Sequence, residues 1–210
     1  MSEDAPRKAD EAREAGADAV EVRIDMYDDA AEALDDVRDC DALPVIATNR
    51  ANDRQTEDER VGTLVAATED AAAVDIDVTS PDESTERVAE AADENGSTVI
   101  ASHHDFDGTP PIDSMMETLE SAWEVGDVAK LAVTPWDEGD VLDVLRLTLE
   151  ARDEGDGPFC TISMGALGSY TRFVAPLYGS SLTYASFGAG TAPGQLSVRE
   201  VNEYVERFSP

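Results

Sequence analysis

Lys130 lies in surroundings that point to chemistry. It is one of two lysines in the chain and belongs to the apolar run VAKLAVT, residues 128–134, where a charge is costly unless it is paired or used. A neutral lysine amine attacks carbonyl groups to form a Schiff base, and burial favours the neutral form by lowering the lysine pKa. A shift of that pKa from ~10.4 to ~7.5 costs about 4 kcal/mol. Lys130 therefore predicts a Schiff-base nucleophile, with a buried ion pair to Glu21 as the alternative.

The two histidines of the chain, His103 and His104, are adjacent in the sequence SHHDF. Side chains alternate along a strand, so the two rings are expected on opposite faces, where they cannot easily bind one metal ion. No metal site is expected. A histidine that faces a Schiff-base lysine is a natural general acid and base at neutral pH. The alternative is a core histidine whose ring is hydrogen-bonded to a backbone carbonyl.

Arg23, Arg50 and Arg172 allow two interpretations. They either pair with nearby acids or clamp a substrate carboxylate, for which the planar guanidinium gives bidentate geometry. The segment GAGTAPGQ, residues 188–195, offers backbone N–H groups and the Gln195 amide, which suit an anionic or hydroxylated ligand.

Short apolar, β-branched runs recur about every 25 to 30 residues, and each is followed by a segment with helical periodicity. The expected strands are 19–25, 43–48, 73–78, 98–103, 128–134, 158–164 and 182–187. Regular alternation of this kind predicts a parallel sheet with helices outside it. Polar residues near the carboxyl ends of such strands face the active-site mouth of a barrel.

Seven strands and eight helices predict an α/β chain with the (β/α)8 TIM-barrel fold, in which residues 1–210 form one catalytic domain. The first helix, at residues 4–15, has no strand before it, so the first barrel strand is expected to be missing or truncated. The alternative is an open doubly wound sheet, although no GxGxxG motif follows the first strand. A capping box of Ser197 and Glu200 predicts the start of the last helix.

The chain of 210 residues carries 15 Lys and Arg against 47 Asp and Glu, a formal net charge of −32. The acids are spread along the whole sequence, which is typical of a protein adapted to high salt rather than of an acidic interaction tail. Phosphate backbones are repelled by such a charge, so no nucleic-acid partner is expected.

No run of about 18 apolar residues is present, so no membrane span is expected. The charged N-terminal sequence lacks the apolar segment of a secretory signal. Cys40 and Cys160 are too few for a disulfide framework and are expected to be small packing residues. These features predict a cytoplasmic protein.

Seven stretches of the sequence, in order and with matching spacing, resemble the type I 3-dehydroquinase family. They are EVRID (21–25), PVIATNR (44–50), ASHHDFDGTP (101–110), AKLAVTP (129–135), ISMGALGSYTR (162–172), YGSSLTYASFG (178–188) and TAPGQ (191–195). The resemblance implies a (β/α)8 barrel and a lyase of the shikimate pathway that dehydrates 3-dehydroquinate to 3-dehydroshikimate without a metal or organic cofactor.

The resemblance also implies residue roles. Lys130 matches the Schiff-base lysine that attacks the C3 ketone, and His104 matches the proton-transfer histidine, while His103 takes a variable position. The positions that match substrate contacts are Glu21, Arg23, Arg50, Arg172, Thr191 and Gln195. Arg172 is expected to hold the substrate carboxylate, with Met164 and Tyr184 lining the pocket. Because the family is often dimeric, a homodimer is expected.

The sequence departs from the family pattern in three places. The family begins with a strand that carries a substrate-contacting serine in some members, and this segment has no counterpart here. After Arg50 the family has an acidic residue and Gly-Gly, whereas this chain has ANDRQTED without glycine, and Thr171 and Thr191 replace serines. The alternatives are another Schiff-base barrel, such as a sugar-phosphate aldolase, and a catalytically inactive barrel that serves as a binding module.

Overall fold

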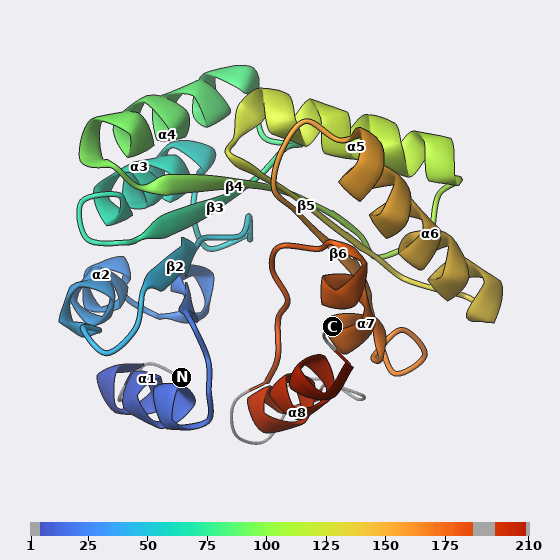
Figure 1. Cartoon of the computed structure of the whole chain (residues 1–210). Helices are drawn as coiled ribbons and strands as arrows, with labels where there is room; N and C mark the ends of the chain where they lie inside the picture. Colours follow the sequence, from blue (N-terminus) through green and yellow to red (C-terminus); the bar gives the residue numbers. More distant parts are fainter. Residues whose placement is uncertain (1–4, 187–195, 209–210) are drawn as a thin grey trace. The chain divides into compact units, whose positions relative to one another are not determined.

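The computed structural model describes residues 5–186 and 196–208, which form helices and parallel strands in alternation (Figure 1). They divide into two compact units. Unit 1 comprises residues 1–101 and 125–127, and unit 2 comprises residues 102–124 and 128–210.

Unit 1 begins with a helix and continues as three strand–helix repeats. Its elements are α1 (Ala5–Glu14), β1 (Val20–Arg23), the 3-10 helix η1 (Ile24–Met26), α2 (Ala30–Asp39), β2 (Val45–Thr48), α3 (Glu57–Ala67), β3 (Ala73–Asp77), α4 (Asp82–Asn95) and the start of β4 (Thr98–Asp105). The β1–β2 register runs from Val20 opposite Val45 to Arg23 opposite Thr48, and Thr48 in turn lies opposite Asp75 of β3.

The core of unit 1 lies between these strands and their helices. Val74 and Ile76 of β3 and Leu64 of α3 are fully buried, and each such side chain stabilises the fold by about 1.5–3 kcal/mol. Helix α3 begins with a capping box, in which Thr56 and Glu59 exchange hydrogen bonds between side chain and backbone. Apolar periodicity and capping thus agree on where this helix lies and where it begins.

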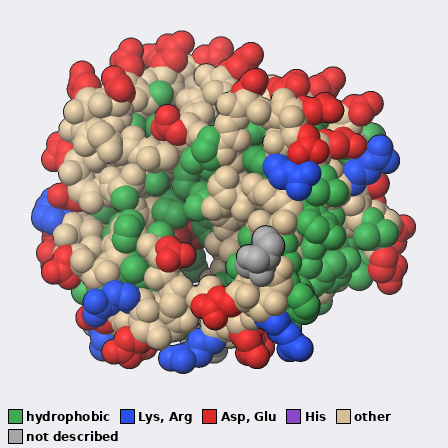
Figure 2. Space-filling view, in the orientation of Figure 1, with side chains coloured by type: hydrophobic (Ala, Val, Ile, Leu, Met, Phe, Trp, Pro, Cys, Tyr) green, Lys and Arg blue, Asp and Glu red, His purple; other side chains and the backbone are tan. Residues whose placement is uncertain are grey.

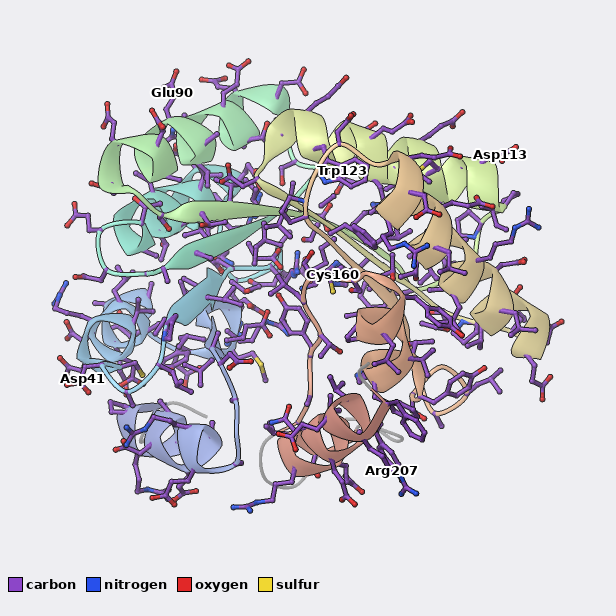
Figure 3. The ribbon with its side chains drawn as sticks, in the orientation of Figure 1. Asp41, Glu90, Asp113, Trp123, Cys160 and Arg207 are labelled. Carbon is purple, nitrogen blue, oxygen red and sulfur yellow. The ribbon has the colours of Figure 1, made fainter. Side chains whose placement is uncertain are left out.

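Unit 2 continues the same alternation. Its elements are the end of β4, α5 (Ile112–Val125), β5 (Val128–Val133), α6 (Glu138–Glu154), β6 (Phe159–Ser163), α7 (Thr171–Tyr178) and α8 (Val198–Phe208). Strands β5 and β6 pair from Ala129 opposite Phe159 to Val133 opposite Ser163. Trp123 of α5, labelled in Figure 3, donates a hydrogen bond of 2.9 Å to the carbonyl of Pro158 just before β6.

The strand order over the described residues follows the sequence, β1-β2-β3-β4-β5-β6. A doubly wound sheet reverses its strand order at a switch point, so the monotonic order excludes that alternative. Parallel strands joined in sequence order by helices are the winding of a β/α barrel. The predicted α/β class and barrel-type winding are therefore confirmed, and six of the seven expected strands are present. The predicted capping box of Ser197 and Glu200 at the start of α8 is also confirmed.

The seventh expected strand, 182–187, is not formed over its described residues 182–186. The backbone N–H of Ser181 donates to the carbonyl of Phe159 on β6 at 2.7 Å, but the ladder does not continue. Hydroxyl groups bond to backbone carbonyls near this segment: Thr183 Oγ1 donates to the carbonyl of Arg172, and Ser180 Oγ donates to that of Leu182. Such local side-chain bonds compete with a sheet ladder. The segment therefore runs as a loop, with one isolated bridge at Ser186.

The surface of the described residues is strongly acidic. Asp and Glu side chains are scattered over the visible face in Figure 2 and do not gather in one block, as the sequence predicts. Asp41, Glu90 and Asp113 in Figure 3 point away from the ribbon. None of the helices in the described ranges is long and apolar enough to cross a membrane.

Candidate active site

Strand β5 buries the amine-bearing side chain of Lys130, which is only 4% exposed. Lys130 lies opposite Cys160 in the β5–β6 register. Its Nζ lies 4.0 Å from the centre of the Tyr184 ring. The amine is thus held in a mostly dry site against an aromatic face.

A small apolar cluster borders this lysine. Its members are Ala132, Cys160 and Ile162, with Met164, Leu182 and Tyr184 packed against them. Figure 3 labels Cys160 on β6, where its thiol is fully buried, and neither Cys160 nor Cys40 forms a disulfide. The two cysteines are packing residues, as predicted. The cluster keeps the surroundings of Lys130 low in polarity, which favours carbonyl chemistry at an amine.

His104 lies near the end of β4, which extends to Asp105, two residues beyond the expected strand. Its ring stacks on that of Phe106 at 6.0 Å between centroids. The loop that follows is fixed by the loop after β5, because Thr134 Oγ1 donates to the carbonyl of Asp105 and Trp136 Nε1 donates to that of Asp107. These bonds set the end of the His104 strand against the end of the Lys130 strand.

Helix α7 presents Arg172 from its first turn. The preceding Thr171 is buried; its Oγ1 accepts a hydrogen bond from the N–H of Ser163 at 3.2 Å and donates to the carbonyl of Gly168 at 2.7 Å. The threonine that replaces the family serine therefore uses its hydroxyl to join α7 to β6. A Cβ at Gly168 would lie 2.3 Å from the Ser163 carbonyl oxygen, so only glycine allows this close approach.

The side chain of Arg172 is partly buried. Its Nη1 is buried without a hydrogen-bond partner among the described residues, and burial lowers the pKa of this arginine. Ser163 Oγ, at the end of β6, is also buried without a partner in the described part of the chain. Buried polar atoms are nearly always hydrogen-bonded, and a guanidinium remains protonated, so this corner favours an anionic acceptor.

In unit 1 the carboxylate of Glu21 is positioned by a hydroxyl of the neighbouring strand. Thr48 Oγ1 donates to Glu21 Oε1 at 2.8 Å, and Thr48 is fully buried at the end of β2. Glu21 itself is exposed. The hydrogen bond fixes one carboxylate oxygen of Glu21.

Arg23 forms a bidentate pair with Asp25. Its Nε and Nη2 donate to the two carboxylate oxygens at 2.9 and 2.7 Å. This hydrogen bonding raises the pKa of Arg23. Burial alone would raise the pKa of Asp25, but the hydrogen bonds and charge of Arg23 outweigh burial and lower it. The strand ends at Arg23, and the turn of η1 brings the acid back to it.

Arg50, just after β2, pairs with two acids of β3. Its Nη2 lies 2.9 Å from a carboxylate oxygen of Asp75, which is 1% exposed, and its Nη1 lies 3.8 Å from Asp77. The register explains the contact, because Thr48 lies opposite Asp75. Of the two interpretations of the arginines, pairing with acids therefore holds for Arg23 and Arg50.

The remaining expected ligand contacts, Thr191 and Gln195, lie within residues 187–195, outside the described residues. In the ranges that the structure does describe, no three His, Cys, Asp or Glu side chains lie together as metal ligands would.

Sequence reasoning missed Arg60. This residue lies on α3 and is 2% exposed, although its segment TEDERVGTLVAATEDAA has the composition of a solvated helix. The signal was its spacing, because Arg60 is four residues before Leu64 and seven before Ala67, on the buried stripe of the helix.

Comparison with known proteins gives consistent matches over nearly the whole chain. The sequence model of the family described as type I 3-dehydroquinase matches residues 2–208. The 3-dehydroquinate dehydratase of Methanosarcina barkeri is 41% identical over 207 residues, which cover 91% of this chain and 85% of that protein. The 3-dehydroquinate dehydratase of Halobacterium salinarum is 45% identical over 192 residues, covering 86% and 84%.

A solved structure gives the same match in three dimensions. The type I 3-dehydroquinate dehydratase of Clostridium difficile, crystallised with covalently modified comenic acid, has a TM-score of 0.89 and 27% identity, and covers 97% of this chain and 86% of its own.

Proposed function

The chain belongs to the type I 3-dehydroquinase family, and we propose that it is a hydro-lyase that dehydrates 3-dehydroquinate to 3-dehydroshikimate through an imine at Lys130. This reaction is a step of the shikimate pathway to aromatic amino acids. The observation that carries the proposal is the buried amine of Lys130 on β5, held against the ring of Tyr184. Family membership disfavours the aldolase alternative.

The proposed mechanism uses the amine of Lys130, the imidazole of His104 and the C3 ketone of the substrate. Neutral Lys130 Nζ attacks the C3 ketone, water is lost, and the resulting iminium acidifies the C2 proton. His104 removes that proton, and the C1 hydroxyl leaves as water with a proton returned by His104. A second water hydrolyses the imine, which releases 3-dehydroshikimate and restores the amine. The covalently modified comenic acid in the Clostridium difficile relative is consistent with covalent chemistry in this family.

Arg172 binds the substrate carboxylate in this proposal. Its buried Nη1 supplies a charge-assisted hydrogen bond that the described residues do not use. Burial of this nitrogen strengthens the bond, because opposite charges attract more strongly where little water screens them. The pair orients the ring of the substrate, so that C3 can face the amine.

Glu21, Arg23 and Arg50 act as contacts to the substrate hydroxyls, together with Thr191 and Gln195. Thr48, Asp25 and Asp75 hold the first three side chains in place through the hydrogen bonds and ion pairs described above. We assign both units to one catalytic domain, residues 1–210, because the family match spans residues 2–208 and so includes both.

The charge pattern supports a further part of the proposal. We propose that the protein works as a cytoplasmic homodimer in a salt-rich cell, since its net charge of −32 is distributed over the chain and a relative comes from Halobacterium salinarum. High salt screens repulsion within and between such chains. Stability and dimer formation should both rise between dilute buffer and molar salt, measured by thermal unfolding and sedimentation. Full stability as a dimer in dilute buffer would contradict salt adaptation.

Borohydride trapping tests the imine directly. Incubation of the folded protein with 3-dehydroquinate and borohydride should add a stable mass to the peptide that contains Lys130. The matched control is Lys8, a partly exposed lysine on α1 that should remain unmodified. A folded protein that binds 3-dehydroquinate without forming the adduct would support the inactive-barrel alternative and contradict the mechanism.

A further inference from the structure

Arg60 is a buried cation with no place in the mechanism above. We infer that Arg60 is a positioning residue, which fixes the segment that carries Arg50 and so maintains the affinity for substrate. This inference rests on the proposed function, because it takes Arg50 as a substrate contact. The atoms that support it all lie within unit 1.

The guanidinium of Arg60 uses all three of its nitrogens. Nε and Nη2 donate to the carboxylate of Glu57 at 2.9 and 2.7 Å, one turn earlier on α3. Nη1 donates to the backbone carbonyl of Asn49 at 3.1 Å, and Nη2 also donates to Ser80 Oγ at 2.8 Å. A planar fork with several donors can join three segments in this way, whereas a lysine amine cannot reproduce the geometry.

The first of these segments carries Arg50. Asn49 is the residue between the end of β2 and Arg50, and its side-chain amide donates back to the carbonyl of Arg60 at 3.2 Å. Gln55 closes the loop, because its Nε2 donates to Asn49 Oδ1 at 2.8 Å and to the carbonyl of Arg50 at 3.1 Å. The backbone on both sides of the Arg50 side chain is therefore fixed by hydrogen bonds.

The second segment carries an acid that faces Arg50. Ser80 lies in the turn after β3, and its N–H donates to the carbonyl of Asp77 at 3.0 Å. Asp77 is one of the two carboxylates beside the Arg50 guanidinium. Arg60 thus joins the backbone that carries Arg50 to the turn that carries its counter-ion, and a change at Arg60 alters both positions together.

The cost of burying a charge argues that this connection has a use. A buried ion pair is often no more stabilising than apolar side chains of the same volume, and Arg60 occupies a stripe that otherwise holds Val61, Leu64 and Ala67. An apolar residue would fill the stripe but would release the Asn49 carbonyl and the Ser80 hydroxyl. The presence of Arg60 at this position is therefore explained by its hydrogen bonds to Asn49 and Ser80.

Steady-state kinetics of Arg60→Lys test the inference. The variant keeps the positive charge but loses the planar guanidinium, so Arg50 should be held less firmly. KM should then rise about 10-fold, the factor expected when the charged hydrogen bond between Arg50 and the substrate is weakened. The value of kcat should stay within about twofold. The matched control is Arg87→Lys on α4, an exposed arginine that bonds Asp58 of the same helix α3, and it should leave both constants unchanged.

A double-mutant cycle separates positioning from a general structural role. Arg50→Ala should raise KM, and Arg60→Lys should add little to KM in that background, because both changes remove the same interaction. Should Arg60→Lys fail to fold, Gln55→Leu releases the Arg50 carbonyl from the loop side and should give the same KM effect and the same non-additivity.

The outcomes distinguish the two proposals. An unchanged KM in Arg50→Ala would contradict the role of Arg50 in the proposed function, and with it this inference. A raised KM in Arg50→Ala with an unchanged KM in folded Arg60→Lys would overturn only the inference. Additive effects in the cycle would also overturn it, because Arg60 would then act independently of Arg50.

Discussion

The two units treat their charged groups differently. In unit 1, Arg23 and Arg50 already have acid partners, and Glu21 already accepts a hydroxyl hydrogen bond. In unit 2, Arg172 Nη1 is buried without a partner among the described residues, and Lys130 Nζ lies over the ring of Tyr184.

The difference indicates that the two units have different tasks in the proposed reaction. In the proposed function, the paired groups of unit 1 are oriented before the substrate binds and need little reorganisation, which favours binding specificity. In the same proposal, the buried Nη1 of Arg172 binds the substrate carboxylate and the buried amine of Lys130 attacks the ketone. Substitutions of the paired groups in unit 1 should therefore affect stability and substrate affinity, whereas substitutions in unit 2 should affect turnover or carboxylate binding with little loss of stability.

After loss of the lysine itself, the largest loss of turnover is expected at His104. In His104→Ala, kcat should fall by about 10²- to 10⁴-fold, the usual contribution of a positioned general acid and base. Stopped assays of 3-dehydroshikimate formation measure the loss, with His103→Ala as the control that should retain turnover. Equal losses in the two variants would contradict the assignment of proton transfer to His104.

Substitution of Arg172 should weaken substrate binding without lowering the stability of the protein. Arg172→Met should raise KM about 100-fold through loss of the charge-assisted bond to the carboxylate, yet leave the melting temperature unchanged or higher, because it removes a charged nitrogen that is buried without a partner among the described residues. Kinetics and thermal unfolding of the same preparation measure both quantities. An unchanged KM, or a clear loss of stability, would show that Arg172 is an ordinary structural arginine.

Substitution of Asp25, in contrast, should lower the stability of the protein. Asp25→Asn should reduce the free energy of unfolding at neutral pH by about 1–2 kcal/mol, because the partly exposed Arg23 loses its bidentate partner. The pKa of Asp25 is lowered in the folded protein, so its stabilisation is fully present above its unfolded pKa of about 4 and is lost as pH falls through the lower folded pKa.

Urea unfolding of Asp25→Asn and the unchanged protein, at constant salt over a range of pH, measures this effect. The two free energies should differ at pH 7 and converge in acid below pH 4. A difference that persists unchanged in acid would mean that the ion pair is not its cause.

Much of this arrangement was predictable from the sequence, because local patterns determine it. The alternation of apolar runs and helices gave six strands, and the capping box gave the start of α8. The loop at 182–186 was not predictable, since its composition is that of a strand and the apolar pattern does not reveal that Ser180 and Thr183 hydroxyls bond to the carbonyls of Leu182 and Arg172.

The candidate site was likewise predictable in part. Motif spacing identified Lys130 and Arg50 as candidates, but which acid pairs with Arg50 depends on the β2–β3 register, which no composition reveals. Arg60 was missed because a buried and an exposed arginine look alike in an acidic helix, and only its place on the apolar stripe separates them.

The most direct test of the central claim is the turnover of Lys130→Met at saturating 3-dehydroquinate. Methionine fills a similar volume without an amine, so the protein should fold and bind substrate while turnover falls to the limit of detection. Arg146→Met, an exposed change on α6, serves as the control and should retain full activity. Turnover of Lys130→Met equal to that of the unchanged protein would contradict the imine mechanism.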